Sequence, residues 1–511
     1  MKKLLTITVV CAAMVTGIWA QKEKSIVIIY ENDVHCAIEG YAKMAGLRDA
    51  IAASDTAYAV IVSCGDFLQG GTAAALSQGQ YIADIMRNMG YQAVTLGNHE
   101  FDYGTKRMKK LLKKIGAPVT CANFYNAGAG KSYYPKYVML QCGDKRIAFI
   151  GALTPETMKF ESYGFYDVKG KMRYDLKPDN FYSIVQQTVD EARSKGADYV
   201  VMLSHMGEKT QSMGFNSHLM VEATRSIDVV LDGHSHSVVP GKEVKNRDGA
   251  PVIVTQTGTL FAYVGKLLIK DGKFQTELIP ITEIPYENAR VKATTDSVTA
   301  LIKAKADKVV GRCDFPLTVT DEKGNYSVRL METNAGDLVT DAYRHFFNAD
   351  IALDNGGGLR NDVLAGTITY GNITALSPYD NTIYLIRATG AQIIETLKES
   401  TILLPEPDGN FPQCAGLRYT IHVSCHTVSE VMVEDKESGK YVAIDPEKSY
   451  SVAVRSYYKY GGFNNVLRGC PIIKATTIMC RDVVVQYIKE TLGGIVPERY
   501  SRPQGRITSR P

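Results

Sequence analysis

The sequence lacks the features that mark several large classes of protein. None of its ten cysteines stands in a C-x-x-C pair, so neither a thiolate zinc site nor a thioredoxin-type redox motif is indicated. No internal repeat, low-complexity tract or long run of like charge occurs, and the formal net charge is only +4. This balance gives no reason to expect nucleic acid or an acidic membrane as a partner. Beyond residue 20 no segment reaches about 18 uninterrupted apolar residues, so we expect no stable membrane span in the mature chain.

What is present at the N-terminus is typical of a secretory signal peptide. Lys2 and Lys3 precede an apolar run from Leu4 to Ala20, and polar residues follow at once. A charged start, a short apolar segment and a small residue at its end predict a signal peptide over residues 1–20 with cleavage after Ala20. An uncleaved membrane anchor is the alternative, although threonine and glycine weaken the run as a spanning helix. We therefore expect an exported protein that is periplasmic or at the cell surface.

The 511 residues exceed what one hydrophobic core can organise and predict more than one domain. In residues 21–285, apolar runs bounded by polar turns alternate with helical segments, which predicts an α/β domain whose sheets are covered on their faces. Residues 286–310 are helical in character, either as a rigid connector between domains or as a surface helix of one of them. Residues 311–511 mix helices with alternating strands, which predicts a second domain of α+β type.

Five short polar motifs in the first domain each follow an apolar strand. They are Asn32-Asp33-Val34-His35, Gly65-Asp66, Gly97-Asn98-His99-Glu100-Phe101-Asp102, Ser204-His205 and Asp232-Gly233-His234-Ser235-His236. Polar clusters just beyond the carboxyl ends of parallel strands converge on one crevice in an open α/β sheet. Carboxylate oxygen, amide oxygen and imidazole nitrogen together suit divalent ions such as zinc or manganese.

Histidine is the most informative residue type in these motifs. A single histidine at a strand end is more often hydrogen-bonded and structural than metal-binding. Five of the nine histidines, however, lie in the motifs, each at a strand-to-loop transition. This concentration favours a metal centre over five separate structural roles.

The motif series resembles the calcineurin-like metallophosphoesterase superfamily and, within it, the 5′-nucleotidase family. The order Asp-x-His, Gly-Asp, Gly-Asn-His-Glu, His and Gly-His-x-His is the ligand series of the superfamily, and the run GNHEFDYG at residues 97–104 looks like the nucleotidase version. The resemblance covers essentially the whole mature chain. It implies a four-layer α/β/β/α metallophosphoesterase domain followed by a 5′-nucleotidase C-terminal domain that binds the substrate.

The resemblance also implies a role for each motif residue. One metal ion would be held by Asp33, His35, Asp66 and His236, and a second by Asp66, Asn98, His205 and His234. Asp66 would bridge the two ions, which activate a water for in-line attack on phosphorus. His99 would contact the phosphoryl group and Asp102 would orient His99, although a plain loop-capping role is the alternative for Asp102. Cys36 departs from the glycine that commonly follows the first histidine in the family.

Substrate choice must come from outside the metal centre, and two features of the second domain are candidates. Arg329 and Arg360 offer guanidinium groups for phosphate, and Asn355 opens a run of three glycines that admits a ligand to the backbone. Taken alone, that run is more often a turn. Phe411 offers a ring that can stack on a nucleobase, although a lone phenylalanine is more often part of the core.

The family resemblance favours the binding roles. Residues matching Arg329, Asn355 and Arg360 hold the nucleotide in 5′-nucleotidases, and the residue matching Phe411 stacks on the base. A second stacking aromatic usually follows a later Gly-Gly pair by three residues, where this chain has Asn465. Phe463 is the aromatic residue that remains as a substitute.

The predicted function is therefore that of an exported two-metal phosphohydrolase that releases phosphate from 5′-nucleotides by attack of a metal-bound hydroxide. Because the second aromatic residue is missing, two alternatives within the same architecture stay open: a UDP-sugar hydrolase, and a 2′,3′-cyclic-nucleotide phosphodiesterase with 3′-nucleotidase activity. A non-catalytic nucleotide-binding protein of the envelope is a third reading, and loss of metal ligands would mark it. Every ligand position is filled.

Overall fold

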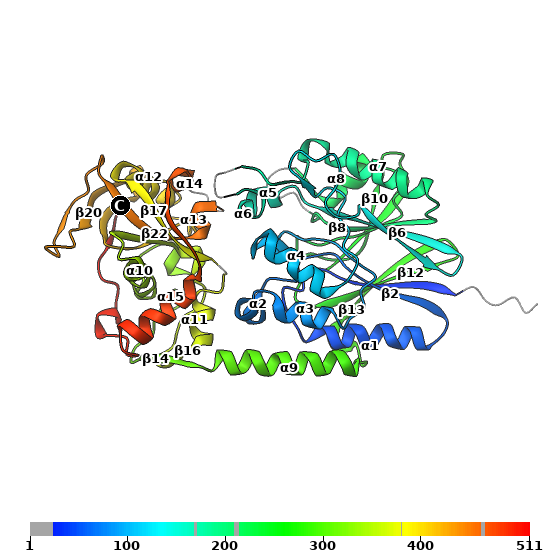
Figure 1. Cartoon of the computed structure of the whole chain (residues 1–511), viewed down its shortest axis with the longest axis horizontal. Coiled ribbons are helices and arrows are strands. Elements are labelled where there is room, and N and C mark those ends of the chain that lie inside the picture. Colours follow the sequence, from blue (N-terminus) through cyan, green and yellow to red (C-terminus); the bar gives the residue numbers. More distant parts are fainter. Residues whose placement is uncertain (1–23, 168–170, 209–213, 380, 461–464) are drawn as a thin grey trace, which may run out of the picture.

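The computed structural model describes residues 24–167, 171–208, 214–379, 381–460 and 465–511. The predicted signal peptide, residues 1–20, lies outside these ranges. Two bodies of mixed α/β structure lie side by side, and the long helix α9 (Ala289–Ala306) runs along the N-terminal body and ends at the C-terminal body (Figure 1). Within the described ranges, no helix has the length and apolar character needed to cross a bilayer.

The N-terminal body contains two large sheets. The first has the strand order β13 (Lys273–Pro280), β12 (Tyr263–Lys270), β1 (Ser25–Glu31), β2 (Ala57–Ser63) and β3 (Ala93–Val94). The second has the order β10 (Val238–Lys245), β11 (Pro251–Thr257), β9 (Val229–Leu231), β8 (Tyr199–His205), β6 (Lys145–Leu153) and β5 (Tyr137–Cys142). In each sheet the central strands are parallel, so their carboxyl ends lie at one edge.

The two sheets face each other across a shared core. Alternate residues of each strand point to opposite sides of its sheet, so only every second residue enters this core. Ile26 and Ile28 of β1 pack with Phe149 of β6 in the core between the sheets, whereas Val27 and Ile29 point to the outer side. Helices α1 (Gly40–Ala53), α3 (Gln80–Met86) and α4 (Gly104–Ile115) cover the outer face of the first sheet, and α7 (Phe181–Ser194) and α8 (Ser217–Ala223) cover that of the second. The predicted four-layer α/β/β/α arrangement is confirmed.

The C-terminal body is built on a mixed sheet. Its strand order is β18 (Pro412–Ala415), β15 (Ile351–Asn355), β22 (Ser449–Arg455), β17 (Thr382–Thr389) and β23 (Ile472–Met479). Beside it lie a sheet of β21 (Tyr441–Ala443), β20 (Thr427–Glu434), β19 (Leu417–His422) and β24 (Ile507–Arg510), and the pair β14 (Val309–Cys313) and β16 (Gly366–Thr369). Helices α10 (Asn334–Phe347) and α15 (Cys480–Gln486) pack on one face of the mixed sheet and α12 (Gly390–Thr401) on the other.

Helix α9 occupies most of the predicted helical segment. The side chain of Asn288 accepts a hydrogen bond from the Val291 amide and caps its first turn. Val291 and Val298 are buried against the N-terminal core, so the first half of the helix packs there. Its last turn reaches α2 (Gly71–Ser77) and α11 (Tyr370–Leu376), which belong to the two different bodies.

Candidate active site

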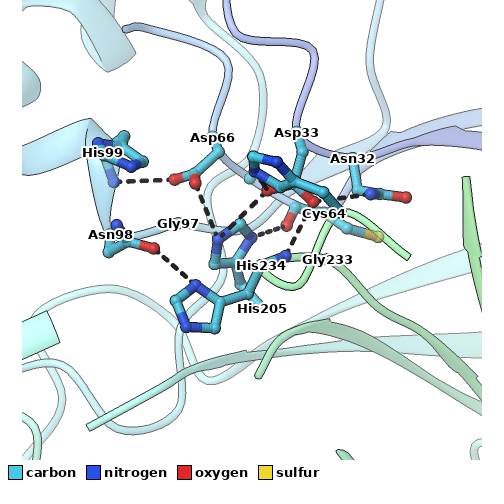
Figure 2. Close-up of polar contacts among 12 residues, drawn as sticks. Asn32, Asp33, Cys64, Asp66, Gly97, Asn98, His99, His205, Gly233 and His234 are labelled. Atoms are coloured by element: carbon cyan, nitrogen blue, oxygen red, sulfur yellow. Dashed lines mark hydrogen bonds and ion pairs between the residues drawn. The ribbon is translucent and has the colours of Figure 1, made fainter. Parts of the chain in front are cut away.

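The predicted metal-centre residues lie together at the carboxyl ends of strands from both facing sheets. Asp33 and His35 follow β1, Asp66 follows β2, Asn98 follows β3, His205 ends β8, and His234 and His236 follow β9. The chain is short between each strand and its motif, so parallel pairing within each sheet and the face-to-face packing of the two sheets bring these side chains to one place. Figure 2 shows the labelled members of this set turned toward one another.

One group of possible ligands consists of Asp33, His35 and His236. The Nε2 atoms of His35 and His236 lie 3.0 Å apart, and Oδ1 of Asp33 lies 3.8 Å from the former and 3.5 Å from the latter. Two nitrogens bound to one tetrahedral ion at about 2.1 Å are roughly 3.4 Å apart, so this spacing suits a shared metal ion. His35 Nδ1 lies 3.2 Å from the Gln69 carbonyl oxygen, which fixes the ring with Nε2 toward the group.

A second group adjoins the first through the two carboxylates. Oδ2 of Asp66 lies 3.1 Å from Nε2 of His205 and 3.9 Å from Nε2 of His35. Oδ1 of Asp33 lies 3.8 Å from the same His205 nitrogen. Both carboxylates therefore face both groups, whereas the family resemblance implies a bridging position for Asp66 alone.

Asn98 and His234 lie on the other side of His205. The Asn98 side-chain oxygen is 2.8 Å from Nδ1 of His234, and the ring centroids of His205 and His234 are 5.3 Å apart (Figure 2). His205 Nδ1 lies 2.8 Å from the Cys64 carbonyl oxygen, so its Nε2 is the atom that faces the carboxylates. In both His205 and His234, Nδ1 therefore lies within hydrogen-bond distance of a neighbouring oxygen.

The residues present fit a binuclear divalent metal site. Oδ1 of Asp33 and Nε2 of His234 are buried and have no hydrogen-bond partner, which is costly unless another group satisfies them. Burial lowers the pKa of His234 to about 4, so its ring is neutral and able to bind a metal ion. Burial also lowers the pKa of His205, but the Asp66 and Asp33 carboxylates outweigh it and raise the value to about 10, which shows that this position favours positive charge.

Many residues of the candidate metal centre adopt the left-handed backbone conformation. The residues with φ in this region are Asp33 (50°), His35 (43°), Cys36 (61°), Asp66 (59°), His234 (82°) and His236 (56°). Each costs a residue with a Cβ roughly 1 kcal/mol, and such strain gathers at functional sites. The value at Cys36 explains why family members commonly have glycine there, since glycine adopts this conformation without that cost.

Two buried residues that are not predicted ligands support the ligand loops. Glu100 accepts hydrogen bonds from the backbone amides of Asp66 and Gly97 and thereby ties two loops together. The Asn32 side-chain amide donates to Oδ2 of Asp33, and its oxygen accepts from the Thr257 amide. Both stand inside the polar motifs, and their adjacency to ligands was the signal that could have identified them.

His99 and Asp102 form the predicted pair beside the metal centre. Nδ1 of His99 lies 3.0 Å from one carboxylate oxygen of Asp102, and the His99 side chain is 34% exposed. Burial lowers the pKa of His99, but the Asp102 and Asp66 carboxylates outweigh it and hold the pKa well above its usual value. Glu161 is a further carboxylate close to this pair, from a segment where the sequence contains no motif.

The predicted phosphate-binding residues of the C-terminal body gather at the glycine turn Gly356–Gly358. Arg329 and Arg360 lie with their guanidinium carbons 4.9 Å and 5.1 Å from the ring centroid of Tyr326. Neither arginine has a carboxylate partner among the residues that the structure describes. Nε of Arg329 and Oδ1 of Asn355 are buried without a hydrogen-bond partner. No hydrogen bond or ion pair in the described ranges joins this set to the metal centre.

The structure does not place Phe411 as the sequence predicted. Its side chain is fully buried in the hydrophobic core between the mixed sheet and α12, so in this structure it offers no face to a nucleobase. The reason is the antiparallel pairing of β18 with β15, which draws the residue before β18 into the core. Phe463, the other predicted aromatic, lies outside the described residues.

Comparison with protein families identifies the two bodies. The model for calcineurin-like phosphoesterases matches residues 26–238, and the model for the 5′-nucleotidase C-terminal domain matches residues 309–468. The chain belongs to the 5′-nucleotidase family. It is accordingly a metal-dependent phosphoric ester hydrolase. Calcineurin-like phosphoesterases use a dinuclear metal site, and the cluster described above contains candidate groups of metal ligands.

Individual members of the 5′-nucleotidase family are similar over most of the chain. The trifunctional nucleotide phosphoesterase protein YfkN of Bacillus subtilis is 26% identical over 495 residues, covering 87% of this chain and 32% of that one, so this chain spans about a third of YfkN. A 5′-nucleotidase of Bos taurus is 24% identical over 504 residues and covers 87% and 84%. The crystal structure of a 5′-nucleotidase precursor from Thermus thermophilus has the same fold, with a TM-score of 0.65, 24% identity and coverage of 95% and 100%.

Proposed function

We propose that this chain is an exported enzyme that releases phosphate from 5′-nucleotides. The observation that carries this proposal is the presence, in one chain, of a complete Asp, Asn and His cluster and of a second domain with two arginines that lack carboxylate partners in the described ranges. The cluster serves phosphate esters in general, and the arginines add recognition of a larger anionic substrate. Relatives named as a nucleotide phosphoesterase and a 5′-nucleotidase support the choice of a nucleotide.

The metal centre would hold two divalent ions, for which the ligand chemistry suits zinc or manganese. As the family resemblance implies, the ligands would be Asp33, His35, Asp66 and His236 for one ion, and Asp66, Asn98, His205 and His234 for the other. When bound, such a pair supplies a water of lowered pKa and neutralises phosphoryl charge. The protein's part is to fix these side chains before substrate arrives, which the buried hydrogen bonds and the strained loops achieve.

His99 acts on the substrate rather than as a ligand in this proposal. Its Nδ1 is engaged by Asp102, which leaves Nε2 to donate a hydrogen bond to a phosphoryl oxygen. The raised pKa of His99 favours the protonated ring, and a cationic donor stabilises the charge that develops on those oxygens. Asp102 keeps the ring in that orientation.

The nucleotide would span the two domains. Arg329 and Arg360 pair with its phosphate oxygens, and the amide of Asn355 stands at the glycine turn beside them. Because Phe411 is buried, recognition of the base depends on other aromatic side chains, of which Phe463 is the candidate from the sequence. Substrate identity therefore needs a direct assay.

The test is a substrate panel with a metal control. Phosphate release is measured from AMP, ADP, ATP, UDP-glucose and 2′,3′-cyclic AMP, before and after exhaustive chelation. We expect AMP to be hydrolysed with the highest kcat/KM and every activity to depend on metal. A preference for UDP-glucose or for the cyclic nucleotide would replace the 5′-nucleotidase proposal with one of its alternatives, and no turnover of any substrate by metal-loaded protein would favour a binding protein.

Export is tested separately on the protein made by cells from the full-length gene. The chain found outside the cytoplasm should begin at Gln21, as predicted for cleavage after Ala20. N-terminal sequencing and the mass of the intact protein check this. An intact N-terminus on membrane-bound protein would indicate an uncleaved anchor instead.

A further inference from the structure

The two arginines of the proposed nucleotide site share one aromatic neighbour. The guanidinium carbons of Arg329 and Arg360 lie 4.9 Å and 5.1 Å from the centroid of the Tyr326 ring. Since both lie within 5.1 Å of one point, the two cationic groups are at most about 10 Å apart. Like charges this close repel one another, and no carboxylate of the described chain pairs with either of them.

We infer that Tyr326 is a positioning residue that holds both arginines in place for the phosphate of the substrate, an inference that rests on the proposed function. An aromatic face carries negative charge density and attracts a guanidinium group placed near it. The ring thus offsets part of the repulsion while leaving the N–H groups of the arginines without a carboxylate. Both guanidinium groups remain available to an anionic ligand, which a salt bridge to aspartate or glutamate would prevent.

The backbone around the two arginines is already fixed, so the ring acts on their side chains. A Cβ on Gly356 would clash with the Val328 carbonyl, which shows that the glycine turn lies directly on the turn that carries Arg329. The Asp408 amide donates to the Arg329 carbonyl at 3.2 Å, and the Arg360 amide donates to that of Leu376 at 2.9 Å. Beyond these points each arginine side chain is long and flexible, and fixing it without a partner costs conformational entropy.

The experiment compares Tyr326→Leu with Tyr326→Phe in the full-length, metal-loaded enzyme. AMP and ribose 5-phosphate serve as substrates, because both carry the phosphate and only one carries a base. Tyr441→Leu is the matched control, since Tyr441 also has an arginine near its ring, with Arg418 at 4.1 Å, in another sheet of the same domain. Bound metal and the midpoint of thermal unfolding are measured for every variant.

We expect Tyr326→Leu to raise KM about fivefold to thirtyfold for both substrates, the effect of losing two cation–π contacts of ordinary strength, with kcat changed much less. Tyr326→Phe keeps the ring face and should restore KM to near the wild-type value. Replacing Arg360 by Ala in the Tyr326→Leu background should cost less than it does in the wild type, because the two changes affect one unit.

Three results would overturn the positioning role: an unchanged KM in Tyr326→Leu, an equal loss in Tyr326→Phe, or a loss for AMP but not for ribose 5-phosphate. The last pattern would make Tyr326 a base-stacking residue. If Tyr326→Leu unfolds or loses metal, Tyr326→Met, which also lacks the ring, replaces it in the KM comparison and in the Arg360 cycle. Failure of the proposed function appears separately, as wild-type protein that does not hydrolyse AMP.

Discussion

Glu100 is completely buried, and its two carboxylate oxygens accept four backbone N–H groups. The donors are the amides of Asp66, Phe67, Leu68 and Gly97, at 2.8, 2.8, 3.1 and 2.5 Å. Burial raises the pKa of Glu100 to about 7, and these hydrogen bonds oppose that rise. A single side chain thus fixes the loop that carries Asp66 to the loop that carries Asn98.

Replacing Glu100 by Gln should weaken the metal centre without removing any ligand. The amide has one acceptor oxygen in place of two, so at least one buried N–H group loses its partner. We expect metal affinity to fall about 10- to 100-fold and the free energy of unfolding to fall by about 1–3 kcal/mol. Glu277→Gln, on the exposed edge strand β13, is the matched control. Unchanged metal content and stability in Glu100→Gln would show that the loops do not depend on this carboxylate.

His99→Ala separates a catalytic role from a ligand role. We expect kcat to fall by about 100-fold or more, because a preorganised charged donor is lost, while two metal ions stay bound. Asp102→Asn should lower kcat less, since the ring remains. His422→Ala, on β19 of the C-terminal domain, controls for loss of an imidazole elsewhere. Loss of metal from His99→Ala, with a smaller effect on kcat, would make His99 a ligand.

Residue by residue, what could be predicted depended on whether the signal was local. The motifs around Asp33 and His234 contain their possible metal ligands within a few consecutive residues, and the structure brings the two motifs together. Phe411 could not be placed, because its burial comes from the pairing of β15 with β18, about sixty residues apart. No sequence pattern marks Glu161 as part of the site, because its proximity to His99 arises only from the tertiary fold.

At the scale of elements, the short turns after the strands decide where the ligands point. Gly97 follows β3, and a Cβ on this residue would clash with the carboxylate of Asp66 on the neighbouring loop. The two loops approach so closely because β2 and β3 pair in parallel. Glycine is therefore required here for space, and not for a positive φ.

Gly97→Ala should displace Asp66 and thereby impair both proposed metal sites. We expect at least a tenfold loss of metal affinity and a similar or larger loss of phosphate release, because the added methyl group cannot be accommodated without moving a shared ligand. The matched control is Gly130→Ala, where a Cβ would meet open space. Normal metal content in Gly97→Ala would mean that the turn can yield without moving Asp66.

Apolar runs indicate where strands lie, but the bounds of a run match the bounds of the strand in some cases only. The apolar run at Val229–Leu231 coincides with β9, whereas the apolar run at Ala93–Leu96 contains only the two-residue strand β3, Ala93–Val94. Strand order could not be predicted, because it depends on pairing between distant segments. The position of β12 between β1 and β13 is an example.

At the scale of the whole molecule, α2 connects the metal centre to the second domain. Its N-terminus follows the loop of Asp66, and its last carbonyl groups accept hydrogen bonds from cations on three different elements. The Leu76 carbonyl accepts from Lys305 of α9 at 2.7 Å, the Ser77 carbonyl from Arg107 of α4 at 3.0 Å, and the Ala75 carbonyl from Arg481 of α15. Such contacts satisfy carbonyls that a helix end leaves open.

Weakening this junction should loosen the arrangement of the domains. Lys305→Gln removes the charged hydrogen bond to α2, and we expect a broader interdomain distance distribution by fluorescence energy transfer between one label on each domain. Lys303→Gln is the control, because Lys303 pairs with Asp307, the residue directly after α9, and is largely exposed. Identical distributions for the two variants would show that Lys305 does not restrain the domains.

A chain of two domains and a helical segment over residues 286–310 could be predicted from length, composition and periodicity, but whether that helix connects the domains or lies on the surface of one of them stayed open. How the domains sit against each other could not be predicted, because it depends on a few side-chain contacts such as that of Arg481 with α2. The order of the motifs along the chain does not contain that information.

The central claim is that phosphate release needs the Asp, Asn and His cluster loaded with two metal ions. The most direct measurement strips the enzyme with a chelator, adds back zinc or manganese in steps, and follows bound metal and phosphate release from AMP together. Activity should be absent from the stripped enzyme and should reach its full value at two ions per chain, and Asp66→Asn should fail to recover. Full activity of the metal-free enzyme, or of Asp66→Asn, would contradict it.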